Sequence, residues 1–179
     1  MNNLASYIDK LREENPLLCF SGATHTQICT LNDISETIFS LLDIAIGYED
    51  DIPYVEGTEL IKADGYFWFW VLGAYEVLRT MSQAKNSFTT KIEIKIDIEK
   101  RYIAEIRMPF AKQEYKGKRK LVSKELCLME NTIDYDKKDV LYQIEGKEFS
   151  FRETIKRFNI FVSSLKKSDV IHPIEIQYK

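Results

Sequence analysis

Histidine and cysteine are the first side chains to consider, because they provide many nucleophiles, general bases and metal ligands. The chain contains two histidines, His25 and His172, and three cysteines, Cys19, Cys29 and Cys127. His25 is close enough in sequence to Cys19 and Cys29 to serve either thiol as a general base. The simpler interpretation is a loop histidine that hydrogen-bonds to its surroundings, and we favour it.

The sequence contains none of the common motifs for phosphate binding, serine hydrolysis or zinc proteolysis. G-x-G-x-x-G, G-x-x-x-x-G-K-[ST], G-x-S-x-G and H-E-x-x-H are all absent. The odd number of cysteines and the lack of a C-x-x-C pair argue against a disulfide framework or a zinc site. We therefore expect free thiols in a reducing compartment, no cofactor, no metal and no identifiable catalytic residue.

Two clusters of like charge could bind ions. Glu49, Asp50 and Asp51 could offer oxygen ligands to a hard cation, but they lack the alternating positions and closing glutamate of a calcium loop. The basic run at 116–120 is bordered by aromatic residues and could bind phosphates and stack on bases. A solvated loop is the favoured interpretation of both clusters. The basic candidates for binding are Lys118, Arg119 and Lys120.

A third cluster combines residues from two predicted helices. Glu76 and Arg79 are i, i+3 neighbours, and Arg107 and Lys112 follow at the end of the next helix. In an antiparallel helix pair Arg107 would lie nearer to Asp64 than to Glu76, so we expect an Asp64–Arg107 ion pair. A structural ion-pair network is the favoured interpretation. The functional alternative is an anion clamp formed by Arg107 and Lys112.

Part of this cluster resembles a pattern in uncharacterised bacterial proteins of similar size. The matching residues are Ala74-Tyr-Glu-x-x-Arg-Thr80 and Arg107-Met-Pro-Phe-Ala-Lys-Gln-Glu114. The resemblance implies a bacterial origin and a helical fold, without an activity. Nucleotide-binding HEPN-type bundles are a second comparison, and their ribonuclease members carry R-x4–6-H. No histidine follows Arg101 or Arg107 at that spacing, so the nuclease motif is absent.

The element that would position these side chains is the stretch from Asp64 to Met81, which contains both tryptophans. Its apolar residues recur at helical spacing, and further apolar residues lie off that face. We therefore expect a helix from about 58 to 83 that is buried on most sides, with an aromatic-rich core around it. Charged residues at both ends leave too few apolar residues for a membrane span. The residues of the main face are Phe67, Trp70, Val71, Ala74, Tyr75, Leu78 and Met81.

Further helices are expected around this one, at about 4–14, 33–46, 90–107 and after Ser150. Residues 91–98 are ambiguous, because alternating isoleucines there also fit a strand. We favour a single helix from about 90 to 107 that ends or kinks at Pro109; a strand would make the fold α+β. Residues 49–57 are expected to form a loop, and 139–151 a small β-hairpin.

Size and charge limit the remaining possibilities. The 179 residues fit one domain, 1–179, and 45% hydrophobic content is ordinary for a globular protein. The net charge of −3 divides into −9 over residues 1–60 and +6 over 61–120. Segments of opposite net charge favour complementary faces that pack together, within one chain or between subunits. Nucleic acid is a possible partner but is not favoured, and a cytoplasmic location is expected because no secretory signal is visible.

The sequence thus predicts a mainly α fold, a bundle of about five helices around a buried central helix, and leaves two functions open. The first is a non-catalytic cytoplasmic interaction or regulatory protein that forms a homo-oligomer or binds a protein partner. The second is an anion-binding protein or an enzyme for a phosphorylated small molecule or nucleic acid. A flat apolar patch would favour the first, and a pocket lined by Trp68 or Trp70 would favour the second.

Overall fold

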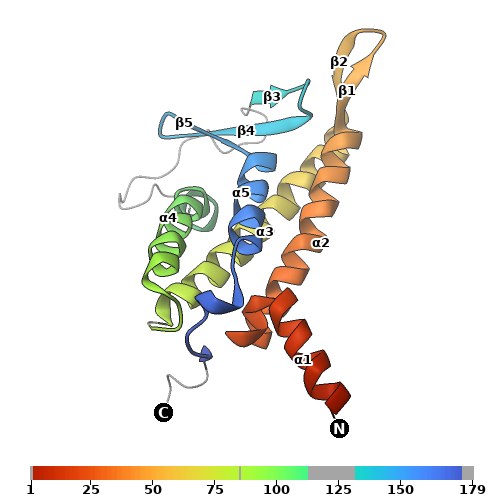
Figure 1. The fold of residues 1–179 in the computed structure, drawn as a ribbon. Coiled ribbons are helices and arrows are strands. Elements are labelled where there is room, and N and C mark those ends of the chain that lie inside the picture. The colour runs from red at the N-terminus through yellow and green to blue at the C-terminus, as the bar shows by residue number, and fades with distance from the viewer. Residues whose placement is uncertain (1, 85, 113–131, 175–179) are drawn as a thin grey trace.

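The computed structural model describes residues 2–84, 86–112 and 132–174 (Figure 1). Within these ranges five α-helices and two small β-sheets confirm the predicted mainly α fold. The helices are α1 (Asn2–Glu14), α2 (Gly22–Ala45), α3 (Gly57–Gln83), α4 (Thr90–Lys112) and α5 (Phe151–Ser163), with short 3-10 helices η1 (Pro16–Cys19) and η4 (Lys167–Asp169). The strands are β1 (Ile46–Glu49), β2 (Ile52–Val55), β3 (Thr132–Asp134), β4 (Asp139–Ile144) and β5 (Lys147–Ser150).

The central helix is α3, and its bounds agree with the predicted 58–83. The side chain of Glu56 caps its amino end by accepting a hydrogen bond from the backbone N–H of Glu59 at 2.6 Å. Helices α2 and α4 pack against α3, and α5 crosses it in Figure 1. None of the helices within the described ranges is both long and apolar enough to cross a membrane.

Stacked rings join α3 to α5. Phe67 and Phe151 are nearly parallel, with ring centroids 3.7 Å apart, and Trp70 meets Phe158 edge-on at 5.4 Å. Phe67 and Trp70 are both fully buried. The predicted apolar face of α3 therefore forms the centre of the core.

The side of α3 that faces α2 packs closely through a glycine. A Cβ atom added at Gly73 would come within 2.9 Å of the Leu31 side chain, so glycine lets the two helices approach closely. The expectation that α3 is buried on most sides is wrong for its outer face, where Tyr66, Trp68 and Phe69 are exposed. Helical periodicity located the buried face correctly but could not show that off-face aromatic residues lack a cover.

Helix α2 and the segment after it differ from prediction. The helix begins at Gly22, eleven residues before the predicted start, because Ser21 caps it by accepting a hydrogen bond from the backbone N–H of Thr24 at 3.2 Å. The predicted loop at 49–57 is largely a hairpin formed by β1 and β2. Its turn residues Asp50 and Asp51 have φ angles of 50° and 64°, which aspartate tolerates better than most residues.

Residues 91–98 are helical, as we favoured. They lie in α4. Four isoleucines of this helix are buried at helical spacing, whereas Ile94 and Ile98 are exposed. The predicted end at about 107 is wrong, because the helix continues to Lys112 with Pro109 inside it. The buried isoleucines are Ile92, Ile96, Ile103 and Ile106.

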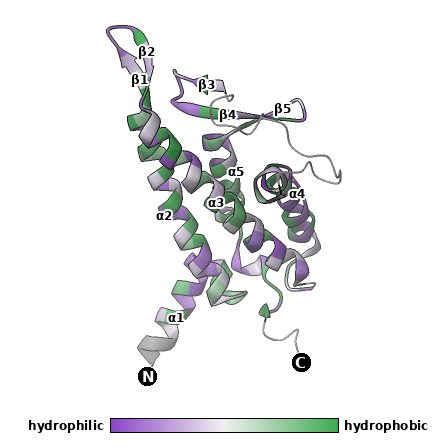
Figure 2. Cartoon of the chain, turned by 180° about the vertical axis from the view of Figure 1, so that it is seen from behind, coloured by the Kyte–Doolittle hydropathy of each residue, from purple (hydrophilic) through white to green (hydrophobic). Residues whose placement is uncertain are grey.

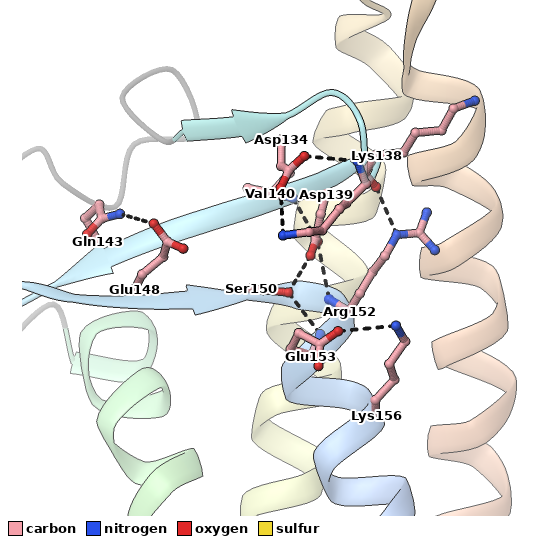
Figure 3. Close-up of polar contacts among 11 residues, drawn as sticks. Asp134, Lys138, Asp139, Val140, Gln143, Glu148, Ser150, Arg152, Glu153 and Lys156 are labelled. Atoms are coloured by element: carbon pink, nitrogen blue, oxygen red, sulfur yellow. Dashed lines mark hydrogen bonds and ion pairs between the residues drawn. The ribbon is translucent and has the colours of Figure 1, made fainter.

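The hairpin before the last helix is confirmed as β4 and β5, and β3 adds a third antiparallel strand. Glu145 and Gly146, with φ angles of 50° and 77°, form the turn. Ser150 then caps α5 by accepting a hydrogen bond from the backbone N–H of Glu153 at 2.9 Å. Figure 3 shows this junction between the sheet and α5.

Candidate functional site

An exposed apolar surface runs along the amino-terminal half of α3. Ile61 is 64% exposed, Phe69 63%, Tyr66 44% and Trp68 37%. These residues lie on the outer side of the helix, opposite the buried core face. Figure 2 shows hydrophobic residues along both α2 and α3 from the side opposite to Figure 1. We call this surface the α3 strip and define it as Ile61, Gly65, Tyr66, Trp68, Phe69 and Leu72.

The α3 strip combines rigid aromatic rings with a glycine. Trp68 and Phe69 stack on each other, with ring centroids 5.7 Å apart. A Cβ atom added at Gly65 would meet nothing within 4 Å, so packing within this chain does not require glycine there. Glycine inside a helix costs about 1 kcal/mol relative to alanine. The strip therefore carries a helix-weakening residue that no contact within the described residues requires.

Charged residues flank the α3 strip on both sides along the helix axis. Glu76 and Arg79 form an ion pair at 2.6 Å, and Arg79 also donates to Gln83 at 3.2 Å. At the other end Lys62 forms an ion pair with Glu59 at 2.6 Å. Two of the predicted binding residues, Glu76 and Arg79, are therefore paired with each other on an exposed surface.

The predicted ion pair between Asp64 and Arg107 is wrong, because no contact within 4.0 Å joins these two described side chains. The guanidinium of Arg107 instead lies 4.7 Å from the ring centroid of Tyr75, and one of its nitrogens contacts the sulfur of Met108 at 3.6 Å. Its Nε atom is buried without a hydrogen-bond partner. Arg107 therefore reaches the middle of α3, not its beginning.

The remaining predicted binding residues cannot be placed. Lys112 ends α4, but its side chain is outside the described residues. Lys118, Arg119 and Lys120 also lie outside them.

Asp64 has a different partner, Tyr142 of β4, whose hydroxyl donates a hydrogen bond to its carboxylate. Burial raises the pKa of Asp64 from its usual range near 3.8, and the bond from Tyr142 opposes this shift. By contrast, hydrogen bonds from Lys100 and Ser82 lower the pKa of Asp97 on α4. The two carboxylates therefore contribute to stability with opposite pH dependence.

We expect Asp64→Asn to become more stable relative to the wild type as pH rises from about 4 to about 7. Because the folded-state pKa of Asp64 is raised, its contribution is fully present below the unfolded pKa and is lost as pH rises through the folded pKa. Asparagine keeps an acceptor for Tyr142 without ionising. Asp97→Asn should show the opposite trend at lower pH, because the folded-state pKa of Asp97 is lowered and its contribution is lost only as pH falls below about 4. Urea unfolding at several pH values measures both, and parallel curves for the two variants would contradict the assignment.

The structure brings one predicted nucleophile–base pair together. His25 and Cys29 lie one turn apart on α2, with Nε2 3.7 Å from the sulfur. Cys29 is exposed and His25 is half-buried, and no other described side chain hydrogen-bonds to the imidazole to orient it. His25 is helical, so the predicted loop position is wrong. Within the described residues no group of three or more histidine, cysteine or acidic side chains could hold a metal ion.

A groove of about 580 Å³ lies between α4, β5 and α5, and several of its charges are already paired. In it Arg157 makes two hydrogen bonds with Glu99, at 2.6 and 3.0 Å, and Lys147 pairs with Glu105 at 2.6 Å. A smaller hollow of about 240 Å³ lies beside Ser82. Neither groove is lined by a tryptophan.

Sequence reasoning proposed Glu76, Arg79 and Arg107 as candidates but did not propose the apolar surface beside them. The available signal was Gly65 within a run of aromatic residues, since a glycine in a helix needs a packing reason. Comparison with known proteins finds no family model, curated protein or solved structure that matches this chain.

Proposed function

We propose that this protein is a non-catalytic interaction protein of the cytoplasm that self-associates through the α3 strip. The observation that carries the proposal is the exposure of three aromatic residues and Ile61 on one face of the central helix. Large exposed apolar patches usually mark interaction sites, and aromatic residues are enriched in interface cores. Free cysteines at Cys19 and Cys29 support a reducing compartment.

The shape of the site favours an interface over a small-molecule pocket. Trp68 lies on the outer face of α3, and Trp70 is fully buried in the core. Ligand pockets are concave and combine apolar walls with a few converging polar groups. The charged groups beside the strip are already paired on the exposed surface, Glu76 with Arg79 and Lys62 with Glu59.

Phe69→Glu is expected to weaken self-association by roughly 30-fold or more, because it places a charge in the centre of an apolar contact. Sedimentation velocity over a range of concentrations measures the change. Ile160→Glu is the matched control, since Ile160 is 71% exposed but belongs to α5. A wild-type protein that is monomeric at all concentrations, or a Phe69→Glu variant that associates normally, would refute self-association through the strip.

Anion binding is the second candidate, and Arg107 is the observation that favours it. Its guanidinium has a buried Nε without a partner, and no described carboxylate lies within 4.0 Å of it. An arginine without a carboxylate partner among the described residues is a suitable ligand for a phosphate. Arg107→Ala should then reduce binding to a nucleotide or RNA from a broad panel, whereas unchanged binding would exclude this role. Arg79→Ala is the control, because Arg79 is already paired.

A further inference from the structure

We infer that two copies of the chain pair through antiparallel α3 helices, with a two-fold axis beside Phe69. This inference rests on the proposed self-association and specifies its partner and register. In a two-fold antiparallel contact centred on one residue, positions equally far before and after the centre face each other. Residues at equal distances before and after Phe69 should therefore complement each other in charge and size.

The charges at the edges of the strip are complementary in this register. Lys62 and Glu76 lie seven residues before and after Phe69, about two helical turns on each side, so all three share one face. Their side chains are 52% and 44% exposed. Pairing about Phe69 places Lys62 against Glu76 of the second copy, and symmetry forms this contact twice. A parallel arrangement would instead oppose Lys62 with Lys62 and Glu76 with Glu76.

The residues between these charges also fit a close helix contact. Gly65 lies four residues before Phe69 on the exposed side of α3, whereas Gly73, four residues after it, is already packed against Leu31 of α2. Tyr66 and Leu72 lie three residues before and after Phe69, so they would face each other across the two-fold axis. A glycine in the contact lets the helices approach closely, and aromatic residues then close the gaps. This contact gives Gly65 the packing reason that its own chain does not provide.

A zero-length carbodiimide cross-linker tests the register directly, because it joins a lysine to a carboxylate in contact. Lys62 and Glu76 of one chain are separated by about 21 Å of helix, too far for such a link. We expect a Lys62–Glu76 cross-linked peptide, formed between differently isotope-labelled copies and absent from Phe69→Glu. If the protein associates but gives no such mixed-isotope peptide, the register is wrong.

Charge reversal provides the second test. Lys62→Glu and Glu76→Lys are each expected to weaken the dimer about tenfold, and the double variant should restore its dissociation constant. Lys156→Glu is the matched control, because Lys156 forms a similar exposed i, i+3 ion pair on α5. If Phe69→Glu dissociates the dimer but the double variant stays as weak as the single ones, the antiparallel register is refuted while self-association stands. If the wild type is monomeric, both are refuted.

Discussion

Replacing Phe67 with alanine is expected to lower the free energy of unfolding by about 3–5 kcal/mol, the usual range for a fully buried phenylalanine. The ring of Phe67 lies parallel to that of Phe151 at 3.7 Å and also stacks with Trp70 and Tyr142. These residues join α3 to α5 and β4. Truncation would leave a cavity where three parts of the structure meet, and rigid neighbours could fill it only in part.

Phe69→Ala is the matched control for this prediction, because it removes the same side chain two residues away on the same helix. Phe69 is 63% exposed, so its loss should change the stability of the single chain by less than about 0.5 kcal/mol. Urea denaturation at a concentration below self-association separates the two effects. Similar losses for both variants would mean that the strip is part of the folded core.

The contrast between Phe67 and Phe69 shows how far the sequence can be interpreted. Spacing assigns Phe67 and Trp70 to one face of a helix, and that face is buried. Phe69 belongs to the same aromatic run, and hydropathy does not distinguish a residue that faces the core from one that faces another molecule. Burial depends on which elements cover each side, and those elements come from distant parts of the chain.

Polar contacts and turns were harder to predict for a related reason. The β1–β2 turn uses Asp50 and Asp51 in left-handed conformations without a glycine, so the usual turn signal is missing. Arg107 lies over Tyr75 and not beside Asp64, because side-chain contacts depend on the tilt and offset of α4 against α3. A sequence gives the order of charges along each helix but not that offset.

Asp139 is a buried carboxylate, only 2% exposed, whose loss is expected to destabilise the fold strongly (Figure 3). One oxygen accepts hydrogen bonds from the backbone N–H groups of Val140 at 2.9 Å and Arg152 at 3.3 Å, and the other accepts from the Ser150 hydroxyl. Burial raises the pKa of Asp139, and the bond from Ser150 opposes that shift. The carboxylate thus ties the start of β4 to the start of α5.

Asp139→Ala is expected to reduce the free energy of unfolding by about 3 kcal/mol, because it leaves several buried donors without an acceptor. Asp43→Ala is the control: Asp43 accepts from Arg152 at 2.5 Å, but its side chain is 59% exposed, so the loss should stay below about 1 kcal/mol. Asp139→Asn keeps one acceptor oxygen and should fall between the two. Chemical denaturation ranks the variants, and an Asp43 effect as large as that of Asp139 would show that the ion pair to α2, not the buried carboxylate, holds the sheet against the helices.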